Sequence, residues 1–398
     1  MMPKKAKKQQ PRNRGQIVPR GEDKWLLRVY TGRNAAGKRM YASKTVQGTF
    51  AAAQKELTAL LSSVDTNTYV PPTRQSLGAF LKTWLSGSLG IEDSTLMGYE
   101  YRVEKYITPA LGHLRLDRVS PQDISKFYGS LEERGLSPRS ILHIHRILHE
   151  AYEQAVEWDT VARNPAAKVT PPKVEQYEAQ VLTPEQVHLF LEGAAEHKYY
   201  LLWHVLFNTG LRPQEAAVLK WEDLQDGNVL TIRRALKKRK NKKTGKLEWY
   251  IGPPKSKKGK RAIPLTEETA ELLASHKVQQ AKQMLAAGAG YVRNDYIFAD
   301  TRGEYLKIRT MHWSFSVLMK QTAAKYPGMP VIRLYDTRHT HFTNLLIAGV
   351  HLKVVQERAG HSTIALTADT YSHVSAAMQQ DAVVEYQKMM ASRKASSG

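Results

Sequence analysis

Hydrophobic and polar positions alternate in the first part of the chain. Residues 24–30 (Lys-Trp-Leu-Leu-Arg-Val-Tyr) and residues 39–46 are typical of two strands, and the glycines at 32 and 37 mark the turn between them. A helix is predicted from Thr49 to about residue 62. The pattern therefore indicates a compact β-rich module, which the Pro71-Pro72 pair ends.

Residues 77–162 have a helical pattern instead. One apolar helix face is formed by Leu77, Phe80, Leu81, Trp84 and Leu85. Further helices are predicted over residues 93–108, 121–134 and 138–157. The last two begin with Ser-Pro pairs, which supply a cap residue and a proline at the first helical position. These segments predict a domain of four helices.

A third domain follows a linker that Pro165 and the Pro171-Pro172 pair bracket. Its first helix starts at the capping box Thr183-Pro-Glu-Gln. Apolar runs predict helices at Leu201 to Phe207 and at Ala216 to Leu219. The chain is thus predicted to be multidomain and mainly α with small β-sheets. We expect a β-rich module at residues 1–66, a four-helix domain at 73–170 and a mixed α/β domain at 178–398.

The positive charge of the chain is concentrated in two places. The formal net charge is +22; residues 1–20 have seven basic and no acidic residues, and residues 233–261 have fourteen basic residues and one acidic residue. A local excess of this size predicts a phosphate-rich partner, which points to nucleic acid. For residues 1–14 alone, a solvated charge run is the better interpretation. Strand-type apolar residues flank the charges of 233–261, so this segment predicts a basic β-hairpin.

Composition also excludes several classes of protein. The chain has no cysteine, so a disulfide, a thiolate zinc site and a cysteine nucleophile are impossible. It has no apolar run of about 18 residues, and its basic N-terminus lacks the apolar stretch of a signal peptide. We therefore expect an intracellular, cytoplasmic protein with no membrane partner.

Candidate chemistry begins at an arginine in the third domain. Arg212 follows a glycine turn at Gly210 and precedes a helix, where its guanidinium can place two N–H donors on a phosphate. The alternative is a helix cap that pairs Arg212 with Glu215. Further along, Tyr335 and Arg338 are three residues apart and share one helix face.

The C-terminal part adds a histidine and a tyrosine. Gly360 is expected to end a helix, with His361 at the start of the next turn and Tyr371 after it. His145 and His149 are spaced for zinc, but no acidic residue follows in the metalloprotease order, so we expect no metal there. His339 and His341 are expected to buttress the site. Residues 372–391 are typical of an amphipathic helix, which packs either on its own domain or on a neighbouring protomer.

The ordered set of an arginine, a basic hairpin, a second arginine, a histidine and a late tyrosine resembles the tyrosine recombinase family, the phage-type integrases. The resemblance covers essentially the whole chain. It implies an arm-type DNA-binding module at 1–66, a helical core-binding domain at 73–170 and a catalytic domain at 178–398. The resemblance implies that Arg212 and Arg338 form the phosphate clamp and that His361 is a further phosphate donor. It implies Tyr371 as the nucleophile and Lys255 as the general acid.

Two positions depart from a simple match. Lys257 competes with Lys255 as the general acid, because the length of this hairpin varies in the family. The family's usual histidine three residues before the second arginine is Tyr335 here. A phenol can donate one hydrogen bond but brings no positive charge, so the phosphate contact and proton role of that histidine are not carried over directly.

The resemblance implies a site-specific DNA recombinase, an integrase that integrates and excises a phage or other mobile element through a covalent 3′-phosphotyrosyl intermediate. Such chemistry needs no ATP, metal or other cofactor. The implied partners are double-stranded DNA at core and arm sites, three further copies in a homo-tetramer, and an accessory bending or directionality factor. The implied location is the nucleoid of a host bacterial cell. Two alternatives stay open: a type IB-like topoisomerase and a non-catalytic DNA-binding protein of the same fold.

Overall fold

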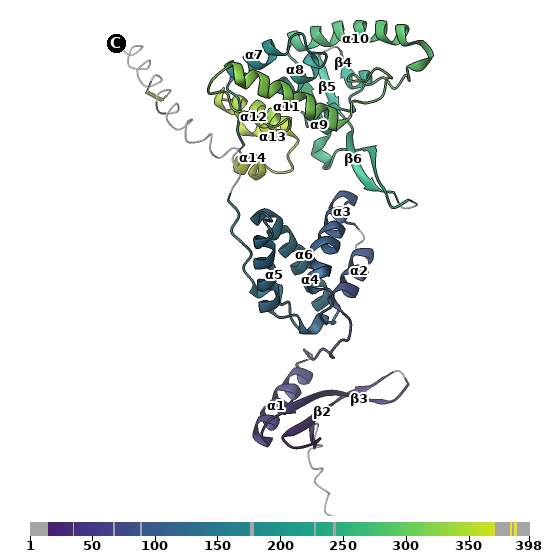
Figure 1. Cartoon of the computed structure of the whole chain (residues 1–398), viewed down its shortest axis with the longest axis vertical. Coiled ribbons are helices and arrows are strands. Elements are labelled where there is room, and N and C mark those ends of the chain that lie inside the picture. The colour runs from purple at the N-terminus through teal and green to yellow at the C-terminus, as the bar shows by residue number, and fades with distance from the viewer. Residues whose placement is uncertain are drawn as a thin grey trace, which may run out of the picture. The chain divides into compact units, whose positions relative to one another are not determined.

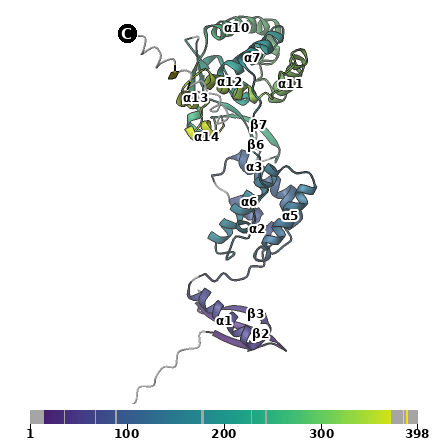
Figure 2. The same cartoon turned by 90° about the vertical axis from the view of Figure 1, so that its left-hand side faces the viewer.

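The computed structural model of the chain describes residues 15–34, 36–66, 68–87, 90–175, 179–226, 228–241, 244–370, 383 and 386–387. The chain divides into two compact units, residues 1–175 and 176–398. Figures 1 and 2 show the elements of both. Most of the helix expected over 372–391 lies outside the described residues. No helix that the structure describes combines the length and the apolar character needed to cross a membrane.

A three-stranded antiparallel sheet opens the first unit. Its strands, in spatial order, are β1 (Gly15–Pro19), β2 (Lys24–Arg33) and β3 (Arg39–Gln47). Helix α1 (Phe50–Asp65) begins at Thr49, whose side chain accepts a hydrogen bond from the Ala52 amide. Leu27 of β2 is buried against α1. The β-rich module is thus confirmed. Strand β1 was not predicted, because its residues lie in the basic stretch 1–20, which was interpreted from its charge alone.

A helical bundle with its own apolar core completes this unit. Its helices are α2 (Leu77–Gly87), α3 (Asp93–Arg102), α4 (Thr108–Leu111), α5 (Pro121–Glu133) and α6 (Pro138–Glu157). Ser120 and Ser137 cap α5 and α6 as predicted. The helix expected over 93–108 instead changes to a π-helical turn at Val103–Ile107 before α4.

The second unit places helices around small antiparallel sheets. One sheet has the order β4 (Leu224–Gln225), β5 (Val229–Ile232) and β8 (Arg261–Pro264). The predicted basic hairpin is present as β6 (Ala235–Lys240) paired with β7 (Leu247–Gly252), and it projects from the rest of the unit in Figures 1 and 2. The helices are α7 (Pro184–Gly193), α8 (Tyr200–Thr209), α9 (Pro213–Ala216), α10 (Glu267–Ala287), α11 (Ile308–Lys325), α12 (Asp336–Ile347), α13 (Leu352–Ala359) and α14 (Ile364–Thr370).

Aromatic packing holds the centre of this unit. Trp203 of α8 is fully buried and meets Phe315 of α11 edge to face, with ring centroids 5.4 Å apart. The helix predicted from Ala216 to Leu219 was wrong, because α9 ends at Ala216. Residues 216–219 are buried on every side. Their apolar run therefore reflects complete burial and not one face of a longer helix.

Candidate active site

The first site arginine leaves a sharp turn between α8 and α9. Gly210 has φ +64°, and a Cβ added there would lie 2.7 Å from ring atoms of both His341 and Phe342. The chain can therefore turn this tightly only with glycine. Arg212 directly precedes α9, and its Nη1 donates to Glu215 Oε1 at 2.8 Å. The pairing with Glu215 is thus present, and it leaves the Arg212 side chain 30% exposed, with N–H groups free for a ligand.

The second arginine of the site, Arg338, lies beneath the Gly210 turn. Arg338 in α12 is 2% exposed. Its Nη1 donates to the Gly210 carbonyl at 2.7 Å, and its Nη2 donates to the Ala359 carbonyl. Burial and the neighbouring Arg212 lower the pKa of Arg338 to about 10, so the guanidinium keeps its charge at neutral pH. Arg338 therefore joins the α8–α9 turn to the end of α13 and brings a fixed charge to this point.

The carboxylate of Glu215 joins the cluster, and its pairing with Arg261 was not predicted from the sequence. Glu215 is 2% exposed and receives both Nη atoms of Arg261, at 3.1 and 2.9 Å. Burial alone would raise the pKa of Glu215, but Arg261, Arg212 and Arg338 together lower it to about 2. Three guanidiniums around one carboxylate leave an excess of positive charge. A phosphodiester, which gains negative charge when it is attacked, fits that excess.

The basic loop between β7 and β8 packs beside the same cluster. Lys258 Nζ donates to the Ser362 carbonyl at 2.9 Å, and a Cβ at Gly360 would lie 2.9 Å from the Lys258 carbonyl oxygen. At the end of the loop, Arg261 Nε donates to the Arg358 carbonyl at 2.7 Å. Lys255 is exposed on this loop, whereas the side chain of Lys257 lies outside the described residues. The choice between the two lysines stays open.

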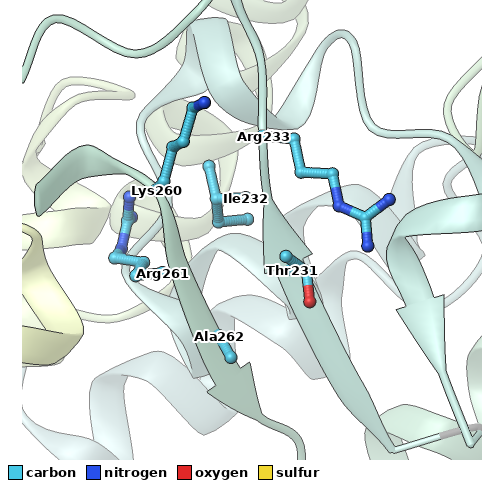
Figure 3. Close-up of a pocket in the computed structure, with 6 residues that line it drawn as sticks. All are labelled: Thr231, Ile232, Arg233, Lys260, Arg261 and Ala262. Atoms are coloured by element: carbon cyan, nitrogen blue, oxygen red, sulfur yellow. The ribbon is translucent and has the colours of Figure 1, made fainter. Parts of the chain in front are cut away.

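Further cations lie at the same end of the sheet. Arg233 directly follows β5 and Lys260 directly precedes β8, and both side chains are exposed. They border a shallow cavity of about 440 Å³ that Figure 3 shows, lined by Thr231, Ile232, Arg233, Lys260, Arg261 and Ala262. In Figure 3 the Arg261 side chain lies on the opposite side of its strand from Arg233. This surface extends the positive charge of the site outward.

His361 contacts the second arginine from the turn after α13. Gly360 ends that helix with φ +66°, as its type predicts, and His361 follows it. The His361 Nε2 atom lies 3.2 Å from Arg338 Nη2, and Nδ1 lies 2.9 Å from Thr367 Oγ1. Burial and the charges of Arg338, Arg212 and Arg261 lower the pKa of His361 to about 4. The imidazole is therefore neutral at pH 7 in the free protein.

Tyr335 lies at the start of α12, beside both arginines. Its side chain is 37% exposed, and its ring lies 5.6 Å from that of His339. Its hydroxyl interacts with the Arg212 side chain. Burial would lower the pKa of Arg212, but Glu215 and Tyr335 together raise it. The structure thus brings Tyr335 together with Arg212, Arg338 and His361.

The expected nucleophile, Tyr371, lies outside the described residues. Helix α14 is described as far as Thr370, and it follows the turn that carries His361. Its packing partner is α13, as Figure 1 also shows. Helix α14, which directly precedes Tyr371, therefore lies next to His361 of the arginine cluster.

The other histidines support the fold. His341 donates from Nδ1 to the Phe207 carbonyl at 2.8 Å and accepts at Nε2 from Arg358 Nε at 3.0 Å. Burial and Arg358 lower its pKa to about 3. His145 lies 3.0 Å from the Tyr128 hydroxyl, and the structure places no metal-binding group of three or more His, Cys, Asp or Glu side chains among the residues it describes.

Comparison with known proteins gives consistent results. Residues 180–378 match the sequence model of the "Phage integrase family", and residues 76–131 match "Phage integrase, N-terminal SAM-like domain". Over 388 residues the chain is 26% identical to a "Tyrosine recombinase XerC-like" protein of Caldanaerobacter subterraneus subsp. tengcongensis, with 92% of this chain and 96% of that protein covered.

Two solved structures share the fold of this chain. The Tn1549 transposon integrase in complex with transposon right end DNA has a TM-score of 0.64 at 24% identity, over 77% of this chain and 99% of that chain. A lambda integrase dimer bound to a COC′ core site has a TM-score of 0.54 at 17% identity, over 92% of this chain and 96% of that chain. The first family model spans half of the chain and includes the arginine cluster. The chain therefore belongs to the phage integrase family and is a tyrosine site-specific recombinase.

Proposed function

We propose that this recombinase integrates and excises a phage or other mobile element by cleaving and rejoining DNA through a 3′-phosphotyrosyl intermediate. One observation carries the proposal. Arg212 and Arg338, far apart in the sequence, meet around the Gly210 turn. Glu215, which also binds Arg261, holds the first, and two main-chain carbonyls hold the second. Such a cluster is preorganised for a phosphodiester, because its positive charges are already held together before the reaction begins.

The two arginines are proposed to bind the nonbridging oxygens of the scissile phosphate. Arg212 has exposed N–H groups at the surface of the cluster, and Arg338 adds positive charge from below. Charge on these oxygens grows as a nucleophile attacks phosphorus. Tyr335 is proposed to replace the usual histidine and to donate one hydrogen bond to the phosphate or to orient Arg212. His361 is proposed to complete the set of phosphate contacts.

Cleavage then exchanges one phosphoester bond for another. The Tyr371 oxygen attacks the scissile phosphorus and loses its proton to solvent. A bond forms between the Tyr371 oxygen and phosphorus, and the bond from phosphorus to the 5′ oxygen breaks. The leaving oxygen takes a proton from Lys255, which lowers the barrier because an alkoxide is a strong base. A 5′-hydroxyl of a partner strand reverses these steps. No nucleotide hydrolysis is required, because the tyrosine ester conserves the energy of the phosphodiester.

The proposed domains have separate tasks. Residues 1–66 bind arm-type DNA sites, residues 73–170 bind the core site, and residues 178–398 carry the chemistry. Three apolar clusters that do not share residues support this division: one around Leu27, one in the helical bundle and one around Trp203. The first module offers a basic surface for DNA, where Arg28 stacks on Tyr41 at 4.3 Å beside Arg33 and Arg39.

The assembly is proposed to be a homo-tetramer on two DNA duplexes. Lambda integrase, which shares the fold, is described as a dimer on its core site, and recombination of two sites needs two such pairs. An accessory factor that bends DNA or sets the direction is proposed as a further partner. The reaction is proposed to take place on the nucleoid, in the cytoplasm of the host cell.

A nicked suicide substrate tests the proposed chemistry. If the proposal is correct, the wild type becomes covalently attached to the 3′ phosphate of the cleaved strand. The short fragment that carries the 5′-hydroxyl diffuses away, so religation cannot occur. Tyr371→Phe should bind the same DNA with unchanged affinity and form no adduct. A type IB-like topoisomerase would also be trapped, but on DNA without a partner site; a non-catalytic protein would form no adduct.

A sulfur substitution distinguishes the general acid. A substrate with sulfur at the bridging 5′ position needs no proton at the leaving group, because a thiolate leaves readily. Lys255→Ala should cleave ordinary DNA poorly and recover on the sulfur substrate. Arg212→Ala should not recover, because its charge acts on the nonbridging oxygens. Recovery of Lys257→Ala in place of Lys255→Ala would assign the acid to Lys257.

A further inference from the structure

A threonine in α14 contacts the site histidine from the side opposite Arg338. Thr367 Oγ1 lies 2.9 Å from His361 Nδ1. From residue 362 to residue 368, Thr367 is the one residue whose side chain is buried; it has no exposed surface. An apolar residue is the usual choice where a short helix buries a single side chain. A hydroxyl at this position, facing a site histidine, therefore needs a reason.

The two contacts of His361 determine where its proton lies. Arg338 can only donate hydrogen bonds, so the Nε2 atom that faces it at 3.2 Å must accept. A neutral imidazole that accepts at Nε2 holds its proton on Nδ1. Nδ1 therefore donates to Thr367 Oγ1. Without an acceptor at this place, the partly buried Nδ1–H would lose its partner in the protein, which is costly.

We propose that Thr367 is a positioning residue: it accepts the Nδ1 proton of the tautomer that Arg338 favours, holds the ring orientation of His361 and ties α14 to the arginine cluster. This inference rests on the proposed function, in which His361 contacts the scissile phosphate. Thr367 lies four residues before Tyr371 in the sequence. The hydrogen bond from His361 to Thr367 thus connects α14, which precedes the proposed nucleophile, with a proposed phosphate contact.

A hydroxyl suits this task because it both donates and accepts. In the free protein it accepts from Nδ1–H. When a phosphate oxygen replaces Arg338 as the neighbour of Nε2, His361 must carry a proton there in order to donate. The hydroxyl can then donate to Nδ1, or go on accepting if the ring takes a second proton. Valine has nearly the same shape as threonine and can do neither, whereas serine keeps the hydroxyl.

Three variants of the full chain separate this role from general support of α14. Thr367→Val removes the hydroxyl, and Thr367→Ser keeps it. Thr363→Val is the matched control: Thr363 is an exposed threonine at the start of the same helix, where its Oγ1 accepts from the Leu366 amide at 3.3 Å. Loss of that bond weakens the helix without a direct effect on His361. The tautomer of His361 is read from the ring nitrogen shifts of histidine-labelled protein, with His361→Gln to assign the signal.

The tautomer measurement needs no catalysis. Wild type, Thr367→Ser and Thr363→Val should hold the proton on Nδ1, and Thr367→Val should shift His361 toward the Nε2–H form. An Nε2–H tautomer in the free wild type overturns the proposal, and so does an unchanged tautomer in Thr367→Val. If Thr367→Val does not fold, Thr367→Ala removes the same hydroxyl and takes its place in the measurement.

The rate of adduct formation on the suicide substrate provides the second readout. Thr367→Val should be slower by roughly 10- to 100-fold, the scale for loss of a partner that orients a reacting side chain. Thr367→Ser should recover most of the rate, and equal losses in Thr367→Val and Thr363→Val would reduce Thr367 to a structural residue. A wild type that forms no adduct at all would refute the proposed function instead, and the tautomer result would still stand.

Discussion

At the scale of single residues, the site consists of local motifs joined by contacts between distant positions. Arg212, Arg338 and His361 each lie in a short segment whose turn or helix start the sequence reveals, so these residues could be predicted as a set. The pair of Glu215 and Arg261 could not, because its partners are 46 positions apart and no spacing rule connects them. Arg261 is also one of many basic residues in the segment 233–261, so the sequence does not show that its side chain is buried.

Tyr335 is expected to contribute through its hydroxyl. Tyr335→Ala should slow adduct formation by roughly 10²-fold, the scale for losing one donor to the transition state. Tyr335→His should retain activity, because an imidazole can supply the same hydrogen bond. Single-turnover rates on the suicide substrate check both variants. An alanine variant with the full rate would show that the position is structural.

His341 is expected to make stability depend on pH. Its pKa is about 3 in the folded chain and near 6.5 when unfolded. Between these two pKa values the unfolded state therefore binds a proton at His341 that the folded state does not. The contribution of neutral His341 to stability is complete above about pH 6.5 and falls as the pH is lowered toward 3. Between pH 7.5 and 5.5 the wild type should lose about 1.4 kcal/mol more stability than His341→Gln. Urea unfolding at the two pH values measures this, and equal losses would contradict the assignment.

At the scale of elements, most boundaries followed from caps, prolines and glycine turns. The start of α5 at Ser120 and the end of α13 at Gly360 are examples. Several elements did not follow, and two show why. Strand β1 exists because it pairs with β2, a tertiary contact that its own basic surroundings do not suggest. The helix predicted over 93–108 changes at Val103–Ile107, where Pro109 of α4 has no N–H for the Lys105 carbonyl; the apolar pattern alone does not show this change.

The turn at Gly210 provides a prediction with a matched control. Gly210→Ala should destabilise the chain by about 3 kcal/mol or more, because it adds strain at positive φ and overlap with His341 and Phe342. Gly245→Ala has nearly the same φ, +66°, and open space around the added Cβ. It should cost only about 1 kcal/mol. Denaturant unfolding compares the two variants, and equal costs would show that packing at Gly210 is not tight.

At the scale of the whole molecule, separate modules are proposed to contact DNA. Removal of residues 1–66 should preserve cleavage of an isolated core site, because the helical bundle and the second unit keep their own apolar cores. Binding to distal arm sites should weaken strongly. Gel-shift and cleavage assays on core and arm DNA test this. Loss of core cleavage would mean that the module boundary or the role of the module is wrong.

The central claim is that Tyr371 is the residue that becomes attached to DNA. Mass spectrometry of the trapped adduct tests it most directly. Trypsin leaves Tyr371 and Tyr386 on one peptide, but cleavage after Glu385 separates them. The account predicts a nucleotide remnant on the peptide that contains Tyr371 and on no other. A remnant on Tyr386, or on any other side chain, would contradict it.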